Sequence, residues 1–202
     1  VDFSVITGPL TVTAQYRMAT YTVTFDLTDR GIRTGGGELV QTVPHGEAAL
    51  EPDVEPNTGW IFEGWDVPFD NITSPLTVTA QYSVATYTVT FDLDGKGTRT
   101  GGGELVQTVA HGEAAVEPIV EANTGWVFLR WNKSFNNITG TVTVTALYYQ
   151  KVYIVDFKLD GKGTRTGGGE LAQTVAHGEA AIAPVVTAYT GWVFQGWDKP
   201  FD

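Results

Sequence analysis

The chain has 202 residues, a formal net charge of −11 at pH 7 and no cysteine. The absence of cysteine excludes disulfides, thiol nucleophiles and cysteine-based zinc sites, and the acidity argues against a nucleic-acid partner, which would need a basic patch. No apolar run approaches the roughly 20 residues of a membrane span. The sequence opens without a signal peptide, so we expect either that a leader has been removed or that the chain is a segment of something longer.

The N-terminal segment, residues 1–20, has the pattern of a final strand followed by a connector. Apolar and polar residues alternate from residue 10 onward, which predicts a strand with one buried face. The residues on the apolar side are Leu10, Val12, Ala14 and Tyr16. Residues 6–16 match residues 72–82 almost letter for letter, so we expect this segment to be the last strand of a preceding or permuted repeat.

The first complete unit, residues 21–86, is predicted to contain four strands and at most a trace of helix. Threonine and β-branched residues favour strands, and the expected ones are residues 21–27, 38–43, 58–65 and 76–82. The glycine-rich residues 28–37 are predicted to form a hairpin loop that needs positive φ. Residues 47–50 could form one helical turn before Pro52, and residues 52–57 read as an extended crossover.

A bulge is expected in the aromatic strand of this unit. In strict alternation Phe62 and Trp65 would face opposite sides of the sheet. A bulge at Gly64 would bring both side chains into the core, which is a common use of glycine within a strand. Arg130 stands at this position in the second unit, which weakens the argument there.

The aromatic strand occurs three times with a constant spacing of 66 residues, and its copies hold all six tryptophans. Constant spacing indicates a tandem array. The expected units are residues 21–86, 87–152 and 153–202, the last without its final strand. A unit of this size buries only about 60% of its unfolded surface, so its large aromatic residues must supply much of the stability.

Four segments of the second unit, in this order, carry a family resemblance: residues 87–92, 107–112, 125–131 and 141–146. They resemble the Listeria–Bacteroides repeat, the B-repeat of internalin-type bacterial surface proteins, and the resemblance covers almost the whole chain in register. It implies a compact β-grasp-like module, a tandem stalk, export to the cell surface and a role in adhesion or spacing. It implies no catalytic residues. The expected fold is therefore mainly β, a tandem array of small four-stranded β-grasp-like units with little or no helix.

The glycine-rich loop is the sharpest candidate for chemistry. Its sequence over residues 94–105 is identical to that over residues 160–171. A phosphate-binding loop is excluded because no Gly-Lys-Ser/Thr motif and no helix follow. Calcium ligation by Asp92, Asp94 and Glu104 lacks the full calcium-loop spacing. A hairpin loop is favoured, and a contact with a neighbouring unit or subunit through three equivalent arginines stays open; these are Arg33, Arg99 and Arg165.

No catalytic residue, cofactor or metal is expected elsewhere. The histidines occur once per unit, at His45, His111 and His177, and are assigned to turns. Three tripeptides fit the N-glycosylation pattern; their acceptors are Asn71, Asn132 and Asn137. The tryptophans could form a carbohydrate platform, but their place in hydrophobic strands favours the core.

The ends of the chain align in a permuted way, because the N-terminal strand has the sequence that the third unit lacks. Three explanations stay open: a segment of a longer array, a ring closed in cis, or a fibre in which this strand completes the neighbour's third unit. The acceptor core would consist of Tyr153, Phe157, Trp192, Phe194 and Trp197.

The expected function is therefore that of a non-enzymatic extracellular stalk or filament subunit. Its partners would be copies of itself or adjacent repeats. The alternative is an adhesin that binds a host or cell-surface glycan or protein through the glycine-rich loops.

Overall fold

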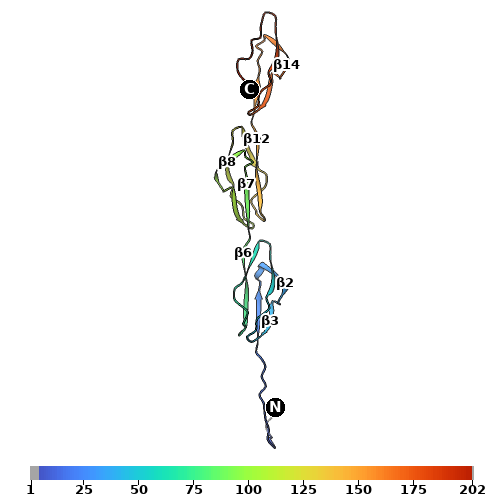
Figure 1. The fold of residues 1–202 in the computed structure, drawn as a ribbon, viewed down its shortest axis with the longest axis vertical. Coiled ribbons are helices and arrows are strands. Elements are labelled where there is room, and N and C mark those ends of the chain that lie inside the picture. Colours follow the sequence, from blue (N-terminus) through green and yellow to red (C-terminus); the bar gives the residue numbers. More distant parts are fainter. Residues whose placement is uncertain (1–4, 202) are drawn as a thin grey trace. The chain divides into compact units, whose positions relative to one another are not determined.

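The computed structural model describes residues 5–201, whose regular elements are all β-strands apart from one short 3-10 turn (Figure 1). The first four residues of the expected N-terminal segment and the last residue of the third unit lie outside this range. The chain divides into two compact units, of which Val1–Ala85 holds the first repeat and Thr86–Asp202 holds the second and third. The prediction of a mainly β array of small repeated sheets with almost no helix is confirmed. Within residues 5–201 no helix is long and apolar enough to cross a membrane.

The first repeat consists of a four-stranded sheet and a two-stranded ribbon. Its elements are β1 (Thr20–Asp26), the 3-10 turn η1 (Thr28–Arg30), β2 (Gly31–Gly36), β3 (Val40–Pro44), β4 (Pro52–Pro56), β5 (Trp60–Trp65) and β6 (Leu76–Val84). The sheet has the order β3-β1-β6-β5. β6 runs parallel to β1 and antiparallel to β5, so the last strand of the repeat lies inside the sheet. β2 and β4 form the antiparallel ribbon.

The second repeat has the same arrangement, and the third has part of it. The second contains β7 (Thr86–Asp92), β8 (Gly97–Gly102), β9 (Val106–Ala110), β10 (Pro118–Ala122), β11 (Trp126–Trp131) and β12 (Val142–Gln150), with the sheet order β11-β12-β7-β9. The third contains β13 (Val152–Asp156), β14 (Gly163–Gly168), β15 (Ala172–Ala176) and β16 (Pro184–Ala188). In it β13 pairs with β15 and β14 with β16.

The glycine-rich segment is a strand for most of its length, so the prediction of a hairpin loop over residues 28–37 is wrong. Residues 31–36 form β2, which pairs with the expected crossover. Glycine is usually unfavourable in strands, because it has no side chain to pack. In this segment, however, the close approach of other backbone atoms leaves no room for a Cβ. A Cβ at Gly37 would overlap the carbonyl oxygen of Leu50. Positive φ occurs at only two residues of the segment, Thr28 with φ of 52° and Gly36, the last residue of β2, with φ of 63°.

The helical turn expected at residues 47–50 is also wrong. Glu47 donates to the Pro44 carbonyl at 3.1 Å, which closes a turn, but the helical pattern does not continue: Ala49 donates to the Phe69 carbonyl at 2.9 Å, and Leu50 donates to Gln41 Oε1 at 2.8 Å. The single helical element of the first repeat is η1, at residues 28–30.

The bulge in the aromatic strand is confirmed, and it does not depend on glycine. The register of β5 on β6 shifts between Phe62 and Gly64, and that of β11 on β12 shifts between Phe128 and Arg130. In both repeats the two aromatic side chains that flank the bulge come together, since Phe62 lies 5.4 Å from Trp65 between ring centroids and Phe128 lies 5.4 Å from Trp131.

The core of each complete repeat covers one face of its sheet. In the first repeat Val23, Phe25 and Val78 are almost fully buried, and Ile72 from the segment after β5 packs on them. The equivalent residues of the second repeat are Val89, Phe91, Val144 and Ile138. The core thus joins the first strand of a repeat to its last.

The N-terminal segment forms no strand over residues 5–19. Its apolar residues are exposed, with Val12 at 57% and Tyr16 at 92%. The prediction of a strand there is wrong for this structure, because within residues 5–201 no neighbouring strand bonds to the segment. An extended segment with the right alternation still needs a partner to become a strand.

Candidate functional site

The candidate site is an open strand position in the third repeat, and the complete repeats show what fills it. In the first repeat β6 bonds on one side to β1, with Val23 beside Leu76 and Phe25 beside Val78. On its other side it bonds to β5, with Phe62 opposite Tyr82. The last strand therefore holds the first strand and the aromatic strand together.

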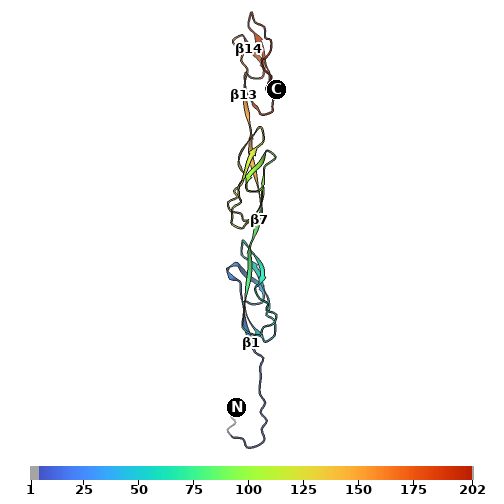
Figure 2. The same cartoon turned by 90° about the vertical axis from the view of Figure 1, so that its left-hand side faces the viewer.

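Residues 153–201 of the third repeat contain the equivalents of both neighbours of this position, and within these residues no strand lies between them. Among residues 5–201, β13 bonds to β15 alone, whereas β1 and β7 each have two partners. The aromatic segment over residues 192–197 forms no strand. Figure 2 shows β13 and β14 at this end of the chain. An unpaired strand edge presents free N–H and C=O groups to any extended segment that can pair with it.

The side chains around the open position are more exposed than their counterparts. Trp192 is 55% and Phe194 43% exposed, whereas the equivalent tryptophans and phenylalanines of the first two repeats are half-buried. Phe157 remains buried, because Trp197 and Phe201 lie 4.7 and 4.9 Å from it between ring centroids. Three of the five predicted acceptor residues thus form one cluster: Phe157, Phe194 and Trp197.

The other two acceptor residues contact side chains outside this cluster. Tyr153 lies on β13 and packs its ring 5.9 Å from that of His177. Trp192 lies under the ammonium group of Lys162, which is 4.6 Å from the ring centroid. The same cation–π contact covers Trp60 with Arg30 and Trp126 with Lys96. Such a contact stabilises by about 0.5–1 kcal/mol at an exposed site, so it orders the tryptophan rings without burying them.

Two grooves lie beside β13 and the aromatic segment of the third repeat. One has a volume of about 520 Å³ and is lined by Gly163, Trp192, Phe194 and Trp197. The other has a volume of about 600 Å³ and runs along β13, lined by Val155, Phe157 and Trp197. Their walls combine aromatic faces with a free strand edge, which are the features of a site for an extended peptide.

The third repeat also lacks a polar contact of the complete repeats. The indole nitrogen of Trp65 donates to Glu51 at 2.8 Å, and that of Trp131 donates to Glu117 at 2.9 Å. Ala183 stands where those glutamates stand in the first two repeats. An alignment of the three repeats shows this difference, so the sequence could have predicted that Trp197 lacks the indole hydrogen bond of Trp65 and Trp131.

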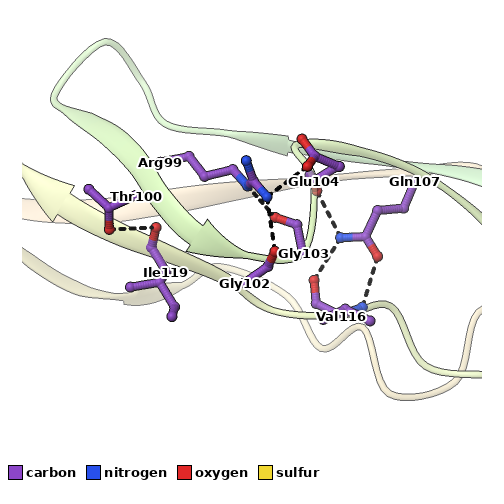
Figure 3. Close-up of polar contacts among 8 residues, drawn as sticks. All are labelled: Arg99, Thr100, Gly102, Gly103, Glu104, Gln107, Val116 and Ile119. Carbon is purple, nitrogen blue, oxygen red and sulfur yellow. Dashed lines mark hydrogen bonds and ion pairs between the residues drawn. The ribbon is translucent and has the colours of Figure 1, made fainter.

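The predicted contact arginines hold their own strands together. In the second repeat Arg99 donates from Nε to the Gly103 carbonyl at 2.6 Å and from Nη2 to Gly102 at 2.9 Å, and it pairs with Glu104 at 2.7 Å (Figure 3). Arg33 and Arg165 make the equivalent contacts. A contact of these arginines with a neighbouring unit or subunit stays a prediction.

A glutamine clamp was missed by the sequence reasoning. Gln107 donates from Nε2 to the carbonyls of Glu104 and Val116 at 2.8 and 2.6 Å, and its Oε1 accepts from the Val116 amide at 2.8 Å (Figure 3). Gln41 and Gln173 do the same. The signal was present in the sequence, because one glutamine recurs at the same position of every unit.

The remaining candidates are accounted for locally. The histidines lie in turns, as predicted, and each packs against the tyrosine of the first strand. No group of three His, Asp or Glu side chains within residues 5–201 could hold a metal ion. Asp94 pairs with Lys96 instead, at 2.6 Å. The asparagines Asn71, Asn132 and Asn137 are exposed, and their glycosylation stays a prediction.

Two tyrosine hydroxyls in the complete repeats are buried and have no hydrogen-bond partner: those of Tyr82 and Tyr148. Burial raises the pKa of the Tyr82 hydroxyl. Burial, and then the charge of Asp94, raise the pKa of Tyr148. A tyrosine whose pKa is higher in the folded than in the unfolded state stabilises the fold below about pH 10, and this contribution is lost as the pH rises through the folded-state pKa.

Replacing Tyr82 and Tyr148 together with phenylalanine is therefore expected to weaken the alkaline loss of stability. At pH 7 the change should stabilise the fold slightly, by about 1 kcal/mol, because an unpaired buried hydroxyl is removed. Urea unfolding at pH 7 and above pH 10 measures both effects. Tyr149→Phe, at a side chain that is 53% exposed, is the matched control. An equal pH dependence in the double variant and the original chain would contradict the expectation.

Comparison with known proteins places the repeats in a described family. The profile of the Listeria-Bacteroides repeat domain matches residues 21–84, 87–150 and 153–200. Two proteins of Evansella cellulosilytica, named "Putative membrane protein" and "Putative Gly-rich membrane protein", are 26% and 23% identical over 93% and 96% of this chain. Internalin H of Listeria monocytogenes is 28% identical over 62% of it.

This chain spans less than a third of each of these relatives, with shares of 29%, 23% and 21%. No solved structure matches it.

Proposed function

Because the chain belongs to the Listeria–Bacteroides repeat family, we propose that it is a non-catalytic structural part of an exported surface protein, in which its repeats act as a stalk. The family match over three consecutive repeats supports this role. The names of the relatives, two membrane proteins and an internalin, support a place at the cell surface.

A structural role also agrees with where the recurring polar side chains go. The arginine and glutamine of each repeat bond to the backbone of that same repeat. The recurring histidine packs on a tyrosine at a turn. An active site would instead bring a nucleophile, a base and an orienting group within hydrogen-bond reach of one another. The recurring side chains thus stabilise their own repeat, which agrees with a role in spacing or adhesion.

We further propose that the strand position beside β13 takes a strand of the same type as residues 10–16, supplied either by an adjacent repeat of a longer chain or by another copy in head-to-tail assembly. The single observation that supports this step is that residues 10–16 match residues 76–82 of β6 in sequence, while within residues 5–201 β13 pairs with β15 alone. The third repeat has grooves beside β13, and the exposed N-terminal segment has the sequence that fills this position in the first repeat.

Strand addition would satisfy both partners. The incoming strand gains backbone bonds on two sides, and its apolar face covers aromatic rings that are exposed without it. Because donor and acceptor lie at different places on the molecule, the contact is heterologous, and repetition without closure produces a filament.

A pair of substitutions on opposite faces of residues 10–16 tests the assembly. Val12 is equivalent to the buried Val78, whereas Thr11 is equivalent to the exposed Thr77. Electron microscopy and sedimentation of the 202-residue chain should show concentration-dependent filaments. Val12→Asp should abolish them, whereas Thr11→Asp, which adds the same charge on the solvent side, should leave them. A monomeric original chain, or filaments that survive Val12→Asp, would overturn head-to-tail assembly.

A further inference from the structure

The second and third repeats lie in one compact unit, and a single residue, Lys151, connects their strands. β12 ends at Gln150 and β13 begins at Val152. The amide of Lys151 donates to the Gly125 carbonyl of the second repeat at 2.8 Å, and its carbonyl accepts from the His177 amide of the third repeat at 2.8 Å. The backbone of one residue is therefore bonded to both repeats.

The imidazole ring of His177 fills the space beside Gly125. Gly125 is buried and has φ of 84°, and a Cβ there would overlap the ring. The ring is held by the third repeat, because its Nδ1 lies 3.4 Å from the Tyr153 hydroxyl. The carbonyl of His177 also accepts from Gln150 Nε2 at 3.0 Å. The imidazole thus has little freedom to move aside, and glycine is required opposite it.

The turn that carries Gly125 is fixed to the rest of the second repeat. Asn123 donates from its amide to the Lys96 carbonyl at 2.8 Å and from Nδ2 to the Gly95 carbonyl at 3.0 Å. The Trp126 amide donates to the Asn123 carbonyl at 3.0 Å, and the Lys96 ammonium lies 4.8 Å from the Trp126 ring centroid. These contacts join the turn after β10 to the turn before β8, so Gly125 does not lie on a free loop.

Both halves of this arrangement recur in the first unit. The Ala85 amide donates to the Gly59 carbonyl at 2.9 Å, and the His45 amide donates to the Ala19 carbonyl at 2.8 Å. Ala19, Ala85 and Lys151 follow one another at the 66-residue spacing of the repeat. The bonds use only backbone atoms of the connecting residue, which explains why alanine and lysine both occur there.

We propose that Lys151, Gly125 and His177 form a rigid joint, in which the turn of one repeat receives the histidine turn of the next repeat of the same type. The inference rests on the proposed stalk role and states how its repeats are coupled. A connector of one residue has only two soft backbone dihedrals, and hydrogen bonds on both sides restrict them. Repeats joined in this way reorient together, whereas flexible linkers rich in glycine and serine behave as random coils.

Distance measurements on the 202-residue chain test the joint, and the absence of cysteine leaves no competing labelling site. Thr108→Cys and Thr174→Cys place spin labels at equivalent exposed positions of β9 and β15. Pulsed electron paramagnetic resonance should give one narrow distance distribution. Gly125→Ala should broaden it. The same substitution should speed hydrogen exchange of the Lys151 and His177 amides about tenfold or more, because the bonds of the joint open.

Gly112→Ala is the matched control for backbone strain. Gly112 belongs to the same repeat and has φ of 83°, but an added Cβ meets no atom of the described residues within 4 Å, apart from its chain neighbours. This variant should keep the narrow distribution of the original chain.

A double variant assigns the effect of Gly125→Ala to the imidazole ring. His177→Ala combined with Gly125→Ala frees the space that the new methyl group needs, so the slow exchange of the Lys151 amide should be largely recovered. If Gly125→Ala alone does not fold, recovery of the fold in the double variant, measured by circular dichroism, is the readout.

The outcomes separate the joint from the stalk. A broad distribution in the original chain would overturn the joint and leave the stalk role, which a flexible array can also fill. Equal broadening by Gly112→Ala, or no recovery in the double variant, would overturn the part assigned to the His177 ring. Absence of the parent protein from the cell surface would refute the proposed function and leave the joint intact.

Discussion

Replacing Trp131 with alanine is expected to cost the second repeat about 3–5 kcal/mol of its free energy of unfolding, the range for removal of a large buried aromatic side chain. Trp131 is 8% exposed, and its ring packs edge-on against Phe91 at 4.9 Å between centroids. Its indole nitrogen also donates to Glu117, so the substitution leaves a carboxylate without its partner. A loss of this size is a large fraction of the roughly 5–15 kcal/mol by which folded domains are stable.

Trp197→Ala is the matched control for this prediction. Trp197 occupies the same position in the third repeat, but it has no glutamate beside it and lies at the open strand position. Its replacement should cost clearly less. Hydrogen exchange resolved by residue measures each repeat separately, because repeats in an array can unfold independently. Equal losses of unfolding free energy in the two variants would contradict the expectation that Trp131 is held more firmly in its core than Trp197.

Replacing Gly103 with alanine is expected to destabilise the second repeat by about 3 kcal/mol, because overpacking forces backbone to move. The added Cβ would overlap the Val116 carbonyl oxygen and come within 2.5 Å of Gln107 Nε2. Both atoms belong to the glutamine clamp. The added methyl group therefore disrupts the hydrogen bonds of the clamp and also forces the backbone apart.

Gly101→Ala supplies the comparison, two residues away on the same segment. There the nearest atom to the new Cβ is the Ile119 Cδ1 at 3.6 Å, an ordinary contact. This substitution should be neutral or slightly stabilising, since alanine restricts the unfolded chain more than glycine does. Urea midpoints of the two variants decide the matter. A similar loss at both positions would mean that strand propensity, rather than the close approach at Gly103, explains the glycines.

The alternation of threonine with valine and phenylalanine was enough to predict the strands of the main sheet, because one buried face imposes a period of two. The bulge was also predictable from Phe62 and Trp65, which strict alternation would separate. Its presence at Arg130 shows that the demand to bury both rings outweighs the preference for glycine.

The ribbon of β2 and β4 could not be predicted in the same way. Glycine has low strand propensity. Gly31 pairs with Pro56, which lies far away in the sequence, so no local pattern predicts this pairing. The glycines are explained by what approaches them: a carbonyl oxygen at Gly37 and a tyrosine hydroxyl at Gly31. The candidate acceptor residues were chosen from alignment alone, and the structure brings Phe157, Phe194 and Trp197 into one cluster.

The central place of β6 and β12 has a consequence for folding during synthesis. Each of these strands comes last in its repeat, yet the sheet orders β3-β1-β6-β5 and β11-β12-β7-β9 place it between the first strand and the aromatic strand. A chain that emerges from its N-terminus must close a long loop before this strand can pair. Such a repeat has a high contact order and folds late and as a whole. The core of each repeat can therefore close only after its last strand has been synthesised, however strongly the earlier segments favour strands.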